Sequence, residues 1–129
     1  MKTKTVLHRH AAWRARQRYG LALTKSLRRA IICAIQGKRC DAVNAVTVRA
    51  SFVYRSSSFR TIWIVDIEGK DHRVVYDGKR SALTTFLPLE MTHREACFQY
   101  KVFWKNRRTE TPEWSFDAWK EANKIRIIE

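Results

Sequence analysis

The stretch FRTIWIVDIEGKDHRVVYDGKRSALTTFLP, residues 59–88, decides the fold. β-Branched and aromatic residues alternate with polar ones, as in half-buried strands, and EGKD and an Asp-Gly pair interrupt the alternation where hairpin turns belong. The stretch therefore predicts three strands, at residues 59–67, 72–77 and 80–88. Another alternating run, at residues 45–55, precedes them, so we expect a four-stranded antiparallel meander.

Two helices are expected before this sheet. Residues 8–19 are rich in Ala and Arg, which favour helix, and a glycine follows where a C-cap belongs. Within this helix Trp13 is expected to anchor to the core. Apolar residues between Leu27 and Ile35 then repeat at i, i+3, i+4, i+7 and i+8, which indicates an amphipathic helix capped by Thr24 or Ser26.

Helical signals return after the sheet. Thr92 and Glu95 form a capping box ahead of a third helix at residues 94–106, and Pro112 is suited to the first turn of a fourth. The terminal residues KIRIIE are apolar enough for a short strand. We therefore expect one α+β domain over residues 1–129, in which two N-terminal helices pack on a four-stranded antiparallel sheet and helices follow at the C-terminus. Four further tryptophans are expected to serve as packing anchors: Trp63, Trp104, Trp114 and Trp119.

Positive charge is concentrated in the first third of the chain. The formal net charge is +14, and residues 1–40 carry eleven Lys or Arg and no Asp or Glu. Such a one-sided distribution favours a polyanionic partner, because neutralising phosphates releases condensed counterions. Nucleic acid is the first candidate and an acidic protein the second. A generally basic proteome would instead spread the charge evenly.

Several classes of protein are disfavoured. No apolar run approaches the roughly 18–20 residues that a membrane span needs, and the N-terminus lacks the apolar core of a signal peptide. His8 and His10 form an H-x-H pair without a nearby third ligand, so no metal and no other cofactor are expected. Cys33, Cys40 and Cys97 show no CxxC spacing and are interpreted as reduced thiols of a cytoplasmic protein, with Cys33 in the core.

His10, Arg14 and Arg18 are spaced at i, i+4 and i+8 and therefore share one helix face. A histidine titrates near neutrality and can transfer protons, and each arginine can clamp a phosphate and stabilise developing charge. On RNA the 2′-hydroxyl supplies the nucleophile, so no metal is required. The same three residues also fit a solvated basic face, which is the commoner meaning of such a pattern.

The segments HAAWRARQRYGLALT, RVVYD and ALTTFLP resemble the BrnT-like ribonuclease toxins and their relatives of the barnase–EndoU–colicin–RelE type of fold. The resemblance covers residues 8–88, as a ribonuclease-like core, and leaves 89–129 as a helical C-terminal extension. It implies metal-independent RNA cleavage that leaves a 2′,3′-cyclic phosphate. In this resemblance His10 is the general acid or base, Arg14 and Arg18 hold the scissile phosphate, and Thr85 hydrogen-bonds phosphate or ribose.

Further contacts to nucleic acid are expected from basic residues near this face and from two residues that flank the Asp-Gly turn. The expected contacts are Arg9, Arg16, Lys25, Arg28, Arg29, Tyr76 and Arg80. A basic group at Lys105, Arg107 and Arg108 is either a second phosphate contact or the cationic end of a helix.

Three functional hypotheses remain open. The first is a toxin-like endoribonuclease that acts in the cytoplasm and is restrained by an acidic antitoxin. The second is a basic nucleic-acid-binding protein without catalysis, which explains the charge equally well. The third is a small phage-type inhibitor that binds a host protein or nucleoprotein complex. Loss of cleavage without loss of binding in His10→Ala separates the first hypothesis from the other two.

Overall fold

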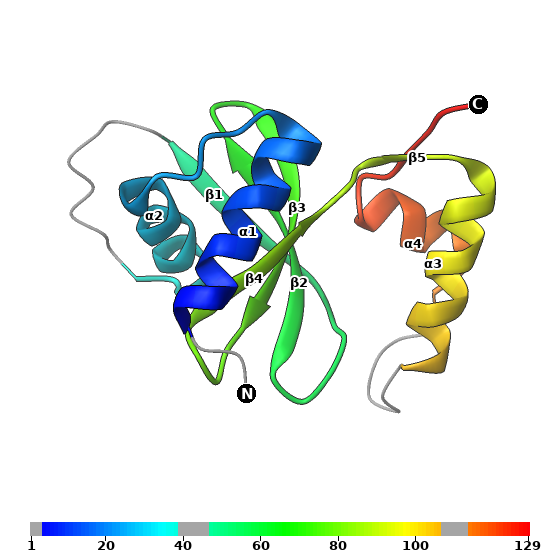
Figure 1. The fold of residues 1–129 in the computed structure, drawn as a ribbon. Coiled ribbons are helices and arrows are strands. Elements are labelled where there is room, and N and C mark those ends of the chain that lie inside the picture. The colour runs from blue at the N-terminus through cyan, green and yellow to red at the C-terminus, as the bar shows by residue number, and fades with distance from the viewer. Residues whose placement is uncertain (1–3, 39–46, 107–113) are drawn as a thin grey trace.

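The computed structural model describes residues 4–38, 47–106 and 114–129 of this protein (Figure 1). Its elements follow the order expected from the sequence, so the predicted α+β class is confirmed. In chain order they are α1 (Lys4–Tyr19), α2 (Lys25–Gln36), β1 (Val48–Arg55), β2 (Arg60–Ile67), β3 (Lys70–Asp77), β4 (Ala82–Leu87), β5 (Glu90–Met91), α3 (His93–Lys105), α4 (Phe116–Ala122) and β6 (Arg126–Ile127).

The four long strands form the predicted antiparallel meander, in the order β1-β2-β3-β4. Trp63 on β2 pairs with Phe52 on β1 and with Val74 on β3, which fixes the register of the sheet. The β3–β4 ladder shifts register between Val75, which pairs with Thr85, and the next residue of β3. Irregularities of this kind bend a strand and re-aim its side chains. The two short strands β5 and β6 pair in parallel as a separate ribbon.

One face of the sheet is covered by α1 and α2. Helix α1 buries Leu7, Ala11 and Ala15, which recur every four residues along one stripe. The two alanines are fully buried, so the helix axis can approach the sheet closely over β4. Helix α2 is capped by Thr24, whose Oγ1 accepts a hydrogen bond from Leu27 N at 3.1 Å, and it lies against β1. The core of this face comprises Ala11, Ala15, Ile31, Ile35, Val65, Ile67, Val74, Tyr76, Leu83 and Phe86.

The C-terminal elements pack against a second core on the opposite face of the sheet. This core is more aromatic, and Trp119 of α4 is fully buried in it. Its members are Val53, Tyr54, Ile62, Ile64, Val75, Met91, Ala96, Phe103, Trp119 and Ile125. Because the cluster joins β1, β2 and β3 to residues beyond 89, the predicted C-terminal extension shares a hydrophobic core with the sheet.

Two predictions, one about packing and one about the start of a helix, are wrong. Trp13 is 55% exposed, so it is not a core anchor. Helix α4 begins at Phe116 with Ser115 as its N-cap, so the final helix starts later than the proline signal indicated, and Pro112 itself lies outside the described residues. The predicted strand at the terminal KIRIIE exists in short form as β6.

The prediction for the cysteines is also wrong in part. Cys33 is half-buried and disulfide-bonded, whereas Cys97 is a free thiol and Cys40 lies outside the described residues. Disulfides persist in oxidising compartments, so the argument for the cytoplasm from reduced thiols does not hold for Cys33. Within the part of the chain described here, no helix is both long enough and apolar enough to cross a bilayer.

Candidate nucleic-acid interface

The outer face of α1 presents an exposed tryptophan among cations. Successive helix residues are rotated by about 100°, so Arg9, His10 and Arg16 lie one turn from Trp13 on its own face. The guanidinium carbon of Arg14 lies 4.5 Å from the centre of the Trp13 ring, within cation–π range. The ring of His10 is centred 6.1 Å from the indole. Trp13 is therefore an accessible aromatic surface bordered by positive charge.

The charges of α1 are not neutralised by the described protein. The helix carries five Lys or Arg and no acidic residue. Among described residues no carboxylate lies within 4.0 Å of these groups, and the side chain of Arg14 instead donates to Gln17 Oε1 at 2.8 Å. Like charges repel along one helix, so an anionic ligand bound to this face would reduce that repulsion.

Arg18 is directed away from this outer face. Its Nη1 donates to the carbonyl oxygen of Phe86, on the edge strand β4, at 2.6 Å. Burial lowers the pKa of Arg18, and the charge of Arg14 lowers it further. The structure thus separates the predicted row of three residues: His10 and Arg14 lie beside Trp13, and Arg18 lies at the edge of the sheet.

Tyr19 links α1 to the ends of two strands. Its hydroxyl donates to the carbonyl of Leu87 and accepts from Arg73 N at 3.1 Å. It therefore replaces a ladder hydrogen bond between β3 and β4. Burial raises the pKa of Tyr19 to about 12, although the hydrogen bond from the backbone of Arg73 opposes the shift.

Thr85 does not join His10 and Arg14. It pairs with Val75, and paired residues in an antiparallel ladder point to the same face. Val75 belongs to the second core, on the face opposite α1. The Thr85 hydroxyl lies 3.5 Å from the carbonyl oxygen of Phe86. The site implied by the family resemblance, with Thr85 facing the helix-borne residues, is therefore not assembled.

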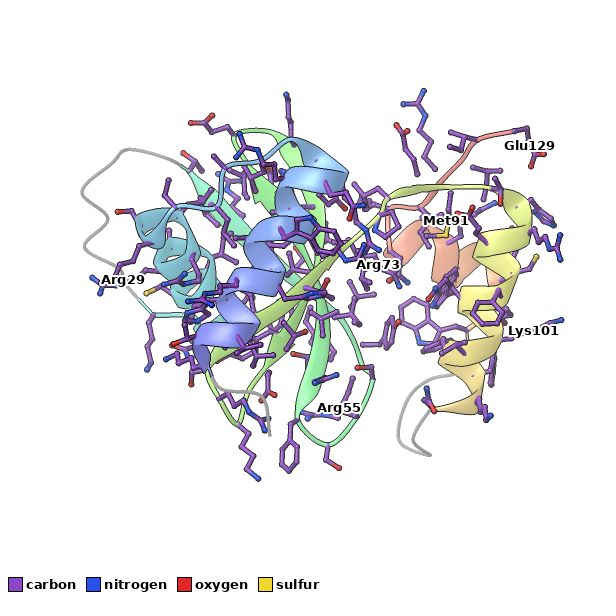
Figure 2. The ribbon with its side chains drawn as sticks, in the orientation of Figure 1. Arg29, Arg55, Arg73, Met91, Lys101 and Glu129 are labelled. Atoms are coloured by element: carbon purple, nitrogen blue, oxygen red, sulfur yellow. The ribbon has the colours of Figure 1, made fainter. Side chains whose placement is uncertain are left out.

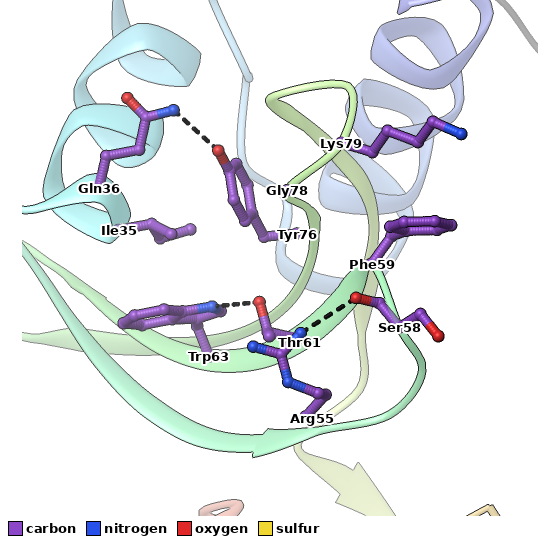
Figure 3. A pocket seen from close by; sticks show the side chains of 10 residues that line it. All are labelled: Ile35, Gln36, Arg55, Ser58, Phe59, Thr61, Trp63, Tyr76, Gly78 and Lys79. Carbon is purple, nitrogen blue, oxygen red and sulfur yellow. Dashed lines mark hydrogen bonds between the residues drawn. The ribbon is translucent and has the colours of Figure 1, made fainter.

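The two predicted contacts beside the Asp-Gly turn have internal partners. Tyr76 is buried in the first core, and its hydroxyl accepts from Gln36 Nε2 at 2.8 Å (Figure 3). Arg80 donates to Asp77 Oδ2 at 2.9 Å. Burial raises the pKa of Asp77, but hydrogen bonds from the backbone and side chain of Arg80 and from the backbone of Lys79 outweigh it, so the pKa is lowered. Neither residue lies on the outer face of α1, beside Trp13.

The remaining predicted contacts are distributed over both N-terminal helices. Arg9, Arg16, Lys25 and Arg29 are exposed and Arg28 is half-buried. Lys105, at the end of α3, is also exposed, whereas its two predicted companions lie outside the described residues.

A cavity of about 480 Å³ lies beside Tyr76 (Figure 3). Trp63 Nε1 donates to Thr61 Oγ1 at 2.7 Å, and Arg55 Nη1 donates to the Ser58 carbonyl at 3.1 Å. Because these polar groups already have partners within the hairpin, we assign the cavity no ligand.

Sequence reasoning missed the exposure of Trp13, although a signal for it was present. Its neighbours at i−4, i−3, i+3 and i+4 are Arg9, His10, Arg16 and Gln17, all polar. An apolar residue at the centre of a polar helix face is expected to be exposed. The burial of Arg73 in β3 was also missed, and it had no local signal, since its surroundings come from distant segments.

The candidate interface offers no obvious metal centre. Among residues 4–38, 47–106 and 114–129, no group of three or more His, Cys, Asp or Glu gathers as a set of metal ligands.

Comparisons with protein-family models, curated proteins and solved structures gave no match.

Proposed function

We propose that this protein binds single-stranded nucleic acid on the outer face of α1. RNA is the preferred candidate. The main observation behind this proposal is that Trp13 is exposed on a helix that has five cations and no acidic residue. An exposed indole offers a flat apolar face on which nucleic-acid bases can stack.

The surroundings of Trp13 fit the two parts of a nucleotide. A base can stack on the indole, while Arg9 and Arg16, one turn away on either side, contact the neighbouring phosphates. A base must be unstacked to lie on the ring, which favours a single strand over a duplex. This type of recognition tolerates most sequences and weakens with salt.

Fluorescence anisotropy with a labelled 12-nucleotide RNA tests the role of Trp13. Base stacking contributes about 1–3 kcal/mol, so Trp13→Ala should weaken binding by roughly 5- to 150-fold. Phe52→Ala is the matched control, because Phe52 is exposed to the same extent, 55%, but lies on β1. Equal effects of the two substitutions would remove Trp13 from the interface.

The salt dependence of the same binding tests the phosphate contacts. Arg16→Gln should reduce the slope of log K against log salt by about 0.7 for one lost contact to a single strand. Arg49→Gln makes the same charge change at an exposed position of β1 and should leave the slope as it is. If neither RNA nor single-stranded DNA binds at low salt, the proposal is wrong and an acidic protein becomes the partner to seek.

RNA cleavage is the second candidate, and one observation favours it. His10 lies on the same accessible face as Trp13 and one turn from Arg14, so an RNA held there brings a phosphodiester near an imidazole. Thr85 and Arg18 are not part of this arrangement, so cleavage would depend on His10 and Arg14.

Incubation of the protein with RNA in EDTA tests cleavage separately from binding. Cyclic-phosphate ends produced by the wild type but not by His10→Ala, with RNA binding retained in both, would support it. Intact RNA at protein concentrations that saturate binding would leave binding alone as the function.

A further inference from the structure

Arg73 is a buried cation without a described anionic partner. Its side chain is 1% exposed, Nε donates to Asn123 Oδ1 at 2.9 Å, and Nη2 donates to the Tyr54 hydroxyl at 3.3 Å. The guanidinium carbon also lies 5.6 Å from the centre of the Trp119 ring. All these partners are neutral, and no described carboxylate lies within 4.0 Å. Burial lowers the pKa of Arg73, yet a guanidinium keeps its proton in proteins.

Arg73 lines a cleft of about 470 Å³ together with Arg18 of α1 and Arg94 of α3. Figure 2 shows Arg73 and Met91 between the sheet and the C-terminal helices. The three arginines that line the cleft come from α1, β3 and α3, and one acidic residue, Glu95, lines it with them. Its other lining residues are Leu87, Pro88, Met91, Phe98 and Gln99.

The first turn of α3 adds to this positive potential. Arg94 and Glu95 belong to that turn, and Thr92 caps it by accepting from Glu95 N at 3.2 Å. The N-terminus of a helix carries about half a positive charge. The cleft thus combines formal and partial positive charges, and a buried arginine without a described anionic partner lines it.

We propose that this cleft binds the terminal phosphate monoester of a nucleic-acid strand. A monoester carries about −1.5 to −2 charges at pH 7, whereas an internal diester carries one. Three arginines and one glutamate line the cleft, so its formal charge is opposite in sign to that of the monoester and similar in size. The exposed Arg94 can bind phosphate with two parallel hydrogen bonds. Arg18 and Arg73 already donate to protein oxygens and add mainly positive charge. Phe98, 62% exposed, is a cleft residue on which the terminal base can stack.

This inference rests on the proposed function and extends it. Arg18 follows Arg14 by one helical turn, and it lines the cleft while Arg14 lies against Trp13. A strand bound along α1 can therefore reach the cleft at Arg18. The outer face of α1 would bind the strand, and the cleft would recognise its end.

The test uses three RNAs of one sequence: one with a 5′-phosphate, one with a 3′-phosphate and one with hydroxyls at both ends. We expect one phosphorylated form to bind at least tenfold more tightly than the hydroxyl form at pH 7. Arg94→Gln should abolish that preference and leave binding of the hydroxyl form nearly unchanged. Arg49→Gln is the matched control and should keep the preference.

The outcomes separate the two proposals. Equal binding of all three RNAs overturns the cleft assignment and leaves the α1 interface standing, whereas no binding of any RNA overturns both. Adenosine 5′-monophosphate that binds as tightly as the phosphorylated strand overturns recognition of a strand end in favour of a free-nucleotide site. The preference should also shrink below pH 6, where the monoester gains its second proton; a preference unchanged at pH 5 contradicts recognition of a dianion.

Discussion

The two faces of the sheet are covered in different ways. On the first face α1 uses small side chains, Ala11 and Ala15, and keeps its cations outside the core. On the second face aromatic side chains around Trp119 fill the core, and they enclose the cation of Arg73. The first arrangement frees an entire helix face for a ligand. The second has to accommodate the buried charge of Arg73, which also lines the cleft.

The difference shows how a very basic helix can remain folded. Burying small residues brings α1 close to β4, and the cationic side chains on its outer face, such as Arg9 and Arg16, then remain in water, where they are well solvated. Helix α1 therefore needs no acidic residue of its own to fold. That freedom leaves its charge available for a partner.

The largest effect is expected at the centre of the second face. Trp119→Ala removes a fully buried indole and should lower the free energy of unfolding by about 3–5 kcal/mol. Trp13→Ala, the same substitution at an exposed site, should change it by less than about 0.5 kcal/mol. Urea unfolding of both variants measures the contrast, and similar losses would mean that the two tryptophans are buried alike.

Overpacking tests the close approach on the first face. Ala11→Leu inserts a larger side chain between α1 and β4 and should destabilise the protein by about 1–3 kcal/mol. Ala118→Leu makes the same change at an exposed position of α4 and serves as the control. Thermal unfolding of both variants is the measurement, and a neutral Ala11→Leu would show that the helix has room to move.

The hydroxyl of Tyr19 joins α1 to the ends of β3 and β4, and its removal should have an effect no larger than that of Ala11→Leu. Tyr19→Phe leaves the N–H of Arg73 and the carbonyl of Leu87 without their partner, which costs about 1–3 kcal/mol when such groups are buried. Tyr76→Phe removes a hydroxyl that contacts only a side-chain amide among the described residues, so its loss should lie near the lower end of that range. Hydrogen exchange at Arg73 N should become faster in Tyr19→Phe and stay unchanged in Tyr76→Phe.

The same contrasts explain which parts of the fold and of the candidate site could be predicted from the sequence. The strands, the first two helices and the Thr24 cap were predicted because they depend on periodicity and local chemistry. The grouping of Arg73 with Asn123 and Tyr54 was not predicted, since it joins residues 50 and 19 positions away. The prediction that Thr85 faces the helix-borne residues failed for a related reason. An irregularity in the β3–β4 ladder decides which face of the sheet Thr85 occupies, and nothing local in the sequence marked that irregularity.

The smallest expected effect is a pH dependence of stability that comes from the first face. His72 is buried against Tyr19, with ring centres 4.6 Å apart. Burial lowers its pKa from 6.5, and hydrogen bonds to the backbone of Lys70 and Val65 offset only part of that shift. The folded protein therefore protonates His72 at a lower pH than the unfolded chain, which protonates it near pH 6.5.

Below that pH the unfolded state binds more protons, so the free energy of unfolding should fall as the pH is lowered from 7 to 5. Burial, followed by the charges of Arg28 and Lys4, lowers the pKa of His8 as well, so His72→Gln should flatten the slope without removing it. Urea unfolding at intervals between pH 5 and 7 measures the slope. A slope unchanged in His72→Gln would mean that folding does not lower the pKa of His72.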